Sequence, residues 1–254
     1  MPGFEEDRDY FHGDGTKAKK LRPVNDMTSS STLSFAKVFL YMFMYLAITA
    51  AVAFGLGYLF TRLIGNPQTS EAASNVYIGL IIGSAIALII MVLVVNFVVI
   101  RGKHSVLVPS IIYCVLVGVL FSCLTIFVDW RIMGLAFAIT SGVFLIMGVI
   151  ASLTKGNMAP LAMMGFGLII GGGLLALVNF FLRSSTIYWI VSFVIFAAIM
   201  FITMFDIWNI KKISENGQMD RNISYYCAFV MYVDFINIFI RILYYLLIIF
   251  GNKK

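Results

Sequence analysis

The sequence predicts an all-α membrane protein built from seven transmembrane helices. Of the 254 residues, 61% are hydrophobic and 12% are charged, and the mean hydropathy is +0.97. The apolar residues form continuous runs of roughly the 20 residues that a helix needs to cross a hydrocarbon core of about 30 Å. The runs do not show the short alternating pattern of a membrane β-barrel, so strands are not expected.

Each apolar run after residue 35 is expected to form one helix. The runs cover residues 36–61, 76–100, 106–128, 133–153, 160–182, 186–209 and 224–250. They leave no room for a separate soluble domain. Residues 36–250 are therefore predicted to be one transmembrane domain, followed by a short C-terminal tail at residues 251–254.

Residues 1–35 differ in kind, with acidic residues first and basic residues later. This segment has no apolar run, so it does not resemble a signal peptide. It also has too few apolar residues to bury a core, and we expect a disordered cytoplasmic tail. Binding of a partner protein is the alternative interpretation of this tail.

Basic residues are distributed unequally between the two sides of the predicted bundle. With the N-terminus inside, the cytoplasmic segments hold twelve: Arg8, Lys17, Lys19, Lys20, Arg22, Lys37, Arg101, Lys103, Lys155, Lys211, Lys212 and Arg221. The opposite side holds five: Arg62, Arg131, Arg183, Lys253 and Lys254. The positive-inside rule therefore favours a cytoplasmic N-terminus and a C-terminus on the other side of the membrane, which is the plasma membrane in a bacterium.

Several function classes are disfavoured. Nucleic-acid binding would need a basic face on a water-exposed domain. A metalloprotease would need a H-E-x-x-H motif, which the sequence lacks. An intramembrane aspartyl protease would need a Gly-x-Gly-Asp motif, whereas the local sequence here is Tyr232-Val233-Asp234. The spacing of Cys114, Cys123 and Cys227 fits no zinc or redox pattern. Because none of these motifs is present, neither enzymatic activity nor a tightly bound cofactor is expected.

Glycines separated by four positions occur in two of the runs, as Gly79 and Gly83 and as Gly167 and Gly171. Small residues let helix backbones approach closely in lipid. These glycines are therefore predicted to lie at helix–helix contacts.

Two acidic residues, Asp206 and Asp234, lie within the last two apolar runs. A charged side chain at membrane depth costs about 2.5 kcal/mol or more on insertion scales, so such a residue usually has a partner or a function. Because the two runs are consecutive and closely joined, their helices are expected to be antiparallel neighbours. The two carboxyl groups are then expected to meet, nearer the cytoplasmic side than the outer side.

Carboxyl groups in contact are not expected to be ionised together without a counter-ion. The pair is expected to share a proton at moderately acidic pH, to titrate as a unit, and to loosen when the proton is lost. The ionised pair would attract Ca²⁺, which prefers carboxylate oxygens, as a permeant or transiently bound ion. The residues alone leave two interpretations open, a structural pair that fixes the bundle and an ion or proton pathway.

Three more polar residues belong to this prediction. Arg101, at the end of the second run, is the nearest cytoplasmic-side cation from another helix and is expected to neutralise one carboxylate. Arg241 lies seven residues after Asp234, two turns along nearly the same helix face. Arg241 either lines the same path nearer the outer side or extends outward to the interface, and Arg241 and Asn237 are candidate pore-lining residues.

The run Tyr232-Val233-Asp234-Phe235-Ile236-Asn237-Ile238-Phe239 resembles the last-helix signature of the transmembrane Bax inhibitor motif family. Phe205-Asp206-Ile207, followed by Ile210-Lys211, resembles the penultimate helix of that family, and Val99-Ile100-Arg101 resembles the end of its second helix. The resemblance covers residues 36–250. It implies a last helix surrounded by the other six. It also implies a pH-sensitive calcium leak in which Asp206 and Asp234 close the cytoplasmic side of a pore and Arg101 modulates them.

Three functions are therefore weighed. The first is a passive calcium channel whose open fraction depends on protonation of the aspartate pair. The second is an interaction protein that binds membrane proteases or cell-death regulators. The third is a proton-coupled cation exchanger that uses the same carboxylates.

Overall fold

The computed structural model describes residues 24–66, 69–101 and 105–251; the side chains of residues 24–34, 99–101 and 251 are outside the description. This part of the chain contains seven α-helices and no strand. They are α1 (Val24–Ile64), α2 (Ser70–Arg101), α3 (Leu107–Phe127), α4 (Trp130–Leu153), α5 (Ala159–Leu182), α6 (Ser185–Glu215) and α7 (Arg221–Gly251). Each is long and apolar enough to cross a membrane. The predicted all-α, seven-helix architecture is confirmed.

Polar residues set several of the helix ends. Asp129 caps α4 by accepting a hydrogen bond from the Arg131 amide at 2.9 Å, and Ser184 caps α6 in the same way through the Ile187 amide. Such caps satisfy amide groups that a helix start leaves without a partner. The first helix, α1, begins at Val24, within the segment 1–35 that was expected to be a tail.

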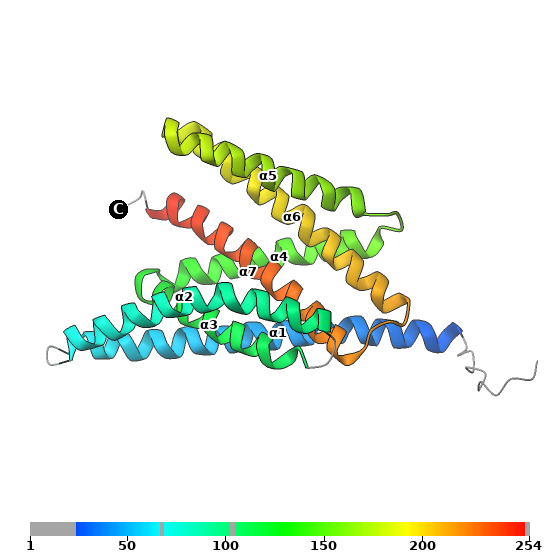
Figure 1. The fold of residues 1–254 in the computed structure, drawn as a ribbon, viewed down its shortest axis with the longest axis horizontal. Helices are drawn as coiled ribbons and strands as arrows, with labels where there is room; N and C mark the ends of the chain where they lie inside the picture. The colour runs from blue at the N-terminus through cyan, green and yellow to red at the C-terminus, as the bar shows by residue number, and fades with distance from the viewer. Residues whose placement is uncertain (1–23, 67–68, 102–104, 252–254) are drawn as a thin grey trace, which may run out of the picture.

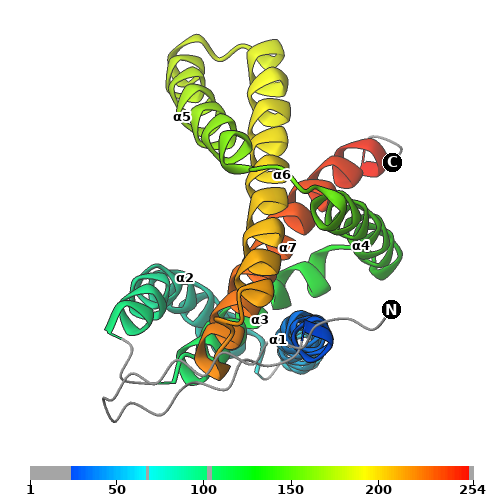
Figure 2. The same cartoon turned by 90° about the vertical axis from the view of Figure 1, so that its right-hand side faces the viewer.

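The helices form a bundle from which one hairpin projects (Figures 1 and 2). α1, α2 and α3 pack on one another, and α5 packs along α6. α7 packs against α1, α3, α4 and α6, and its Tyr226 hydroxyl donates a hydrogen bond to Asn96 of α2 at 3.3 Å. In Figure 2, α5 stands away from α7. A last helix surrounded by all six others stays a prediction.

α7 contributes many side chains to the apolar core. Met231, Tyr232 and Ile238 of this helix are fully buried, and they belong to one apolar cluster with Tyr45 of α1 and Ile207 of α6. Because α7 contributes its buried face to this cluster, any polar side chain on that face is shielded from solvent. Asp234 is such a side chain.

The prediction about the spaced glycines is wrong within the described chain. A Cβ atom added to Gly79, Gly83, Gly167 or Gly171 would meet no atom of another helix within 4 Å. The close approach is instead made at Gly165, where a Cβ atom would lie 3.1 Å from the Ala198 carbonyl oxygen of α6. Equal spacing along a sequence does not show which face of a helix meets its neighbour.

Candidate functional site

The two aspartates meet inside the bundle, as predicted. Asp234 lies on α7 and is 8% exposed, and Asp206 lies on the neighbouring α6 and is partly buried. Their side chains are within hydrogen-bonding reach of each other. A hydrogen bond between two carboxyl groups requires that one of them carry a proton and donate it. The geometry therefore fits a pair that shares a proton.

The Oδ2 atom of Asp234 is buried, and no N–H or hydroxyl group of the described residues donates to it. A buried carboxylate oxygen without a donor is costly, because it has lost its hydration without replacement. The carboxyl group of Asp206 is the polar side chain in contact with Asp234.

One turn before Asp206 on α6, the hydroxyl of Thr203 is also buried and has no hydrogen-bond partner in the described structure. The Tyr226 hydroxyl and the Cys227 thiol of α7 lie close enough to Asp206 to interact with its charge. Cys227 is a buried free thiol. The pair thus has a polar group beside it on each of its two helices.

The structure places α2 beside this site but does not describe the Arg101 side chain. The Tyr226–Asn96 hydrogen bond ties α2 to α7, and α2 ends at Arg101, five residues after Asn96. At a rise of about 1.5 Å per residue, that end lies roughly 7.5 Å farther along the helix. The predicted role of Arg101 depends on a side chain that lies outside the described part of the chain.

Asp234, Asn237 and Arg241 follow one another at spacings of three and four residues, which places them on one face of α7. Asp234 is buried, Arg241 is partly buried, and Asn237 is exposed. Arg241 lies near the hydroxyl of Tyr244, which hydrogen-bonds to Tyr188 of α6. We call Asp234, Asn237, Arg241 and Tyr244 the polar stripe of α7.

A calcium ion at the aspartate pair would need ligands beyond the two carboxylates. No cluster of three or more His, Cys, Asp or Glu side chains occurs among the described residues, whereas Ca²⁺ takes about six to eight oxygen ligands. Water, hydroxyl or backbone oxygens would have to complete the shell.

Sequence reasoning missed Thr49 and Tyr232. Their hydroxyl groups lie 2.6 Å apart, and the Thr49 hydroxyl also donates to the carbonyl oxygen of Cys114 at 3.1 Å. These bonds join α1, α3 and α7 two residues from Asp234. The sequence does place Tyr232 within the resembling motif, but nothing in it pairs this residue with Thr49, 183 positions away.

Comparison with known proteins gives the context of this site. Residues 32–252 match the family described as "Inhibitor of apoptosis-promoting Bax1". The chain belongs to this family. The Bax inhibitor resemblance that the motifs around Asp206 and Asp234 indicated is thereby confirmed.

Two of the similar proteins are bacterial membrane proteins. The inner membrane protein YbhL of Escherichia coli K12 is 31% identical over 150 residues, which cover 56% of this chain and 62% of YbhL. An uncharacterized membrane protein of Streptococcus pyogenes serotype M3 is 26% identical over 211 residues, 82% of this chain and 90% of the relative. No solved structure matches. This member of the Bax inhibitor family is a multi-pass integral membrane protein.

Proposed function

We propose that this protein is a passive calcium leak channel whose open fraction is set by protonation of the pair formed by Asp206 and Asp234. The observation that carries the proposal is the contact of these two carboxyl groups inside an apolar bundle. Membership of the Bax inhibitor family supports it.

With a proton shared between them, the two carboxyl groups hold α6 and α7 together at this level. When the proton leaves, two like charges face each other in a region of low dielectric, where their repulsion is stronger than in water. The contact then loosens, and the ionised oxygens attract Ca²⁺. The flux therefore rises as the pH rises.

The polar stripe of α7 gives the ion a route. It continues from the buried Asp234 towards the far end of α7 through Asn237 and Arg241. Polar and ionisable residues within membrane segments usually face a water-filled path or a partner rather than lipid. In this proposal Asn237 and Arg241 line the path, and Arg101 modulates the pair from the end of α2.

The orientation follows from the distribution of basic residues. We place the N-terminus in the cytoplasm and the C-terminus on the other side, so the α6–α7 turn faces the cytoplasm together with Lys211 and Lys212. The aspartates lie on the side of each helix midpoint that is nearer this turn. The pair would then close the cytoplasmic half of the path.

The test is calcium flux from loaded liposomes that contain the purified full-length protein, measured from pH 5 to pH 8. The wild type is expected to show flux that increases with pH, and Asp206→Asn with Asp234→Asn is expected to remove this dependence. Glu215→Gln is the control, because this exposed acid pairs with Lys211 at the end of α6 and lies outside the pair. Unchanged flux and unchanged pH dependence in the double variant would refute the proposal.

The same liposomes separate a leak from an exchanger. A leak carries Ca²⁺ only down its gradient, whereas an exchanger coupled to protons moves Ca²⁺ uphill when a pH gradient is imposed. Uphill movement in the wild type would replace the leak with the exchanger. A role in binding proteases or cell-death regulators through the N-terminal tail stays a prediction, since residues 1–23 lie outside the described structure.

A further inference from the structure

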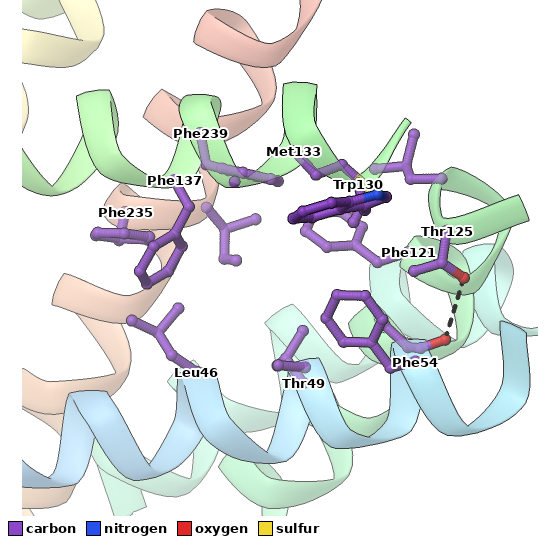
Figure 3. Close-up of a pocket in the computed structure, with 15 residues that line it drawn as sticks. Leu46, Thr49, Phe54, Phe121, Thr125, Trp130, Met133, Phe137, Phe235 and Phe239 are labelled. Atoms are coloured by element: carbon purple, nitrogen blue, oxygen red, sulfur yellow. Dashed lines mark hydrogen bonds between the residues drawn. The ribbon is translucent and has the colours of Figure 1, made fainter. Parts of the chain in front are cut away.

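We propose that a groove between α1 and α4 binds one phosphatidylethanolamine molecule from the membrane leaflet on the α3–α4 turn side. In the described structure α1 and α4 form no extensive contact with each other. Between them lies a cavity of about 480 Å³, bounded in Figure 3 by α1 on one side and α4 on the other. This volume falls within the range of about 300–1,000 Å³ in which proteins bind small molecules.

The deep part of the groove suits an acyl chain. Its lining is almost wholly apolar, with Leu46 and Phe54 from α1, Phe137 from α4 and Phe239 from α7 (Figure 3). The span from Leu46 to Phe54 is eight residues, about 12 Å of helix. One leaflet of a hydrocarbon core is about 15 Å thick. A lipid tail therefore fits the groove in both length and polarity.

The groove continues into a second cavity of about 570 Å³ towards the α3–α4 turn. The two cavities share Phe54, Thr125, Trp130 and Met133 as lining residues. The second cavity adds polar groups, namely the side chains of Tyr58, Thr61 and Asp129. The first cavity is apolar and the second is polar, in the same order as the acyl chains and the headgroup of a phospholipid.

Charges of both signs stand at this mouth. The Arg62 guanidinium lies 5.2 Å from the ring centre of Tyr58, and the Arg131 guanidinium lies 5.7 Å from the ring centre of Trp130. Both arginines are exposed, and guanidinium groups recognise phosphate by charge and hydrogen bonding. They mark where a lipid phosphate would be held.

The carboxylate of Asp129 selects the rest of the headgroup. Only one hydrogen bond, from the Arg131 amide, occupies it in the described structure, and a carboxylate has about four acceptor sites. A primary ammonium group can donate to the remaining sites, whereas the quaternary ammonium of choline has no N–H. One face of each of the Tyr58 and Trp130 rings already carries an arginine, whose charge would repel the choline cation there.

The first experiment measures which lipid stays bound to the full-length protein. The purified protein is incubated with equal amounts of phosphatidylethanolamine, phosphatidylglycerol and phosphatidylcholine, and native mass spectrometry counts the retained lipids. One phosphatidylethanolamine is expected, at least threefold in excess of either other lipid. Equal retention of phosphatidylglycerol would overturn the proposed headgroup.

The second experiment fills the apolar part of the groove. Gly134 of α4 lines the cavity and has no atom within 4 Å of an added Cβ, so Gly134→Phe is expected to reduce retention at least tenfold. Gly142→Phe is the matched control, since Gly142 on the same helix is also unobstructed but lines none of the described cavities. Wild-type retention in Gly134→Phe would overturn the proposal.

Two further variants guard against a folding defect at Gly134. On α1, Ala50→Phe fills the same cavity and should also lose the lipid, whereas Ala51→Phe, at an exposed position that lines none of the described cavities, should keep it. Asp129→Asn keeps the helix cap, since Asn and Asp cap about equally well, but removes the charge. Its preference for phosphatidylethanolamine should fall to about that for phosphatidylcholine, and an unchanged preference would contradict the role of Asp129.

Discussion

The hydroxyl groups of Thr49 and Tyr232 lie 2.6 Å apart and hydrogen-bond across the interface between α1 and α7. The Thr49 proton is directed to the Cys114 carbonyl oxygen of α3, so Tyr232 is the donor in this pair. Two residues further along α7 stands Asp234. The bond thus fixes α7 to α1 and α3 close to the aspartate pair, and in the proposed leak α6 is the helix that moves.

Breaking this bond on one side should destabilise the protein. Thr49→Val leaves the buried Tyr232 hydroxyl with only the Cys114 thiol, a weak acceptor, beside it, and should cost about 1–3 kcal/mol of unfolding free energy. Adding Tyr232→Phe removes this poorly bonded hydroxyl and should recover part of the loss. Thermal unfolding in detergent measures both variants, with Tyr58→Phe on the exposed part of α1 as the control. A double variant less stable than Thr49→Val alone would contradict the bond.

Stability should depend on pH through the aspartate pair. The shared proton joins α6 to α7, and its loss places two like charges in contact. The wild type should therefore unfold at a lower temperature at pH 8 than at pH 5. Replacing both Asp206 and Asp234 by Asn should flatten this profile. The unfolding free energies of the two single variants and the double variant should give an interaction energy between the two side chains of about 0.5–3 kcal/mol. Additive single effects would show that the two side chains do not interact.

Removing the cation at the end of α2 should shift the flux profile. A nearby positive charge favours the ionised form of a carboxyl group, so Arg101→Gln should let the pair keep its proton to higher pH. The pH at which half of the maximal calcium flux is reached should then rise. Lys155→Gln, which changes an exposed residue after α4, is the control. A midpoint that falls in Arg101→Gln would reverse the sign of the proposed interaction.

Two glycines of α5 should respond differently to the same substitution. A methyl group at Gly165 would lie 2.7 Å from the Ile202 Cγ1 atom and 3.1 Å from the Ala198 carbonyl oxygen, whereas at Gly167 it would meet nothing within 4 Å. Overpacking of this kind costs about 1–3 kcal/mol. Gly165→Ala should therefore lower the unfolding temperature and Gly167→Ala should leave it nearly unchanged. Equal effects would place the α5–α6 contact on another face.

Much of the site could be predicted from the sequence, because the cost of a charge in lipid makes two embedded aspartates conspicuous. Their consecutive helices and short connection also predicted that they would meet, and the structure brings Asp206 and Asp234 together. The prediction about the spaced glycines was wrong because a glycine carries no comparable signal. Lipid and the protein interior are both apolar, so the sequence does not show whether a glycine faces lipid or another helix.

The sequence alone determined the membrane location, the number of helices and the presence of an acidic pair, since all three follow from the polarity of segments along the chain. Only the tertiary structure decided that Tyr232 bonds to Thr49, that Gly165 rather than Gly167 meets α6, and that α1 and α4 leave a groove between them. These features depend on the rotation and spacing of helices that are distant in the chain. Side-chain packing fixes those variables, and hydrophobic periodicity does not record them in segments that are apolar on every face.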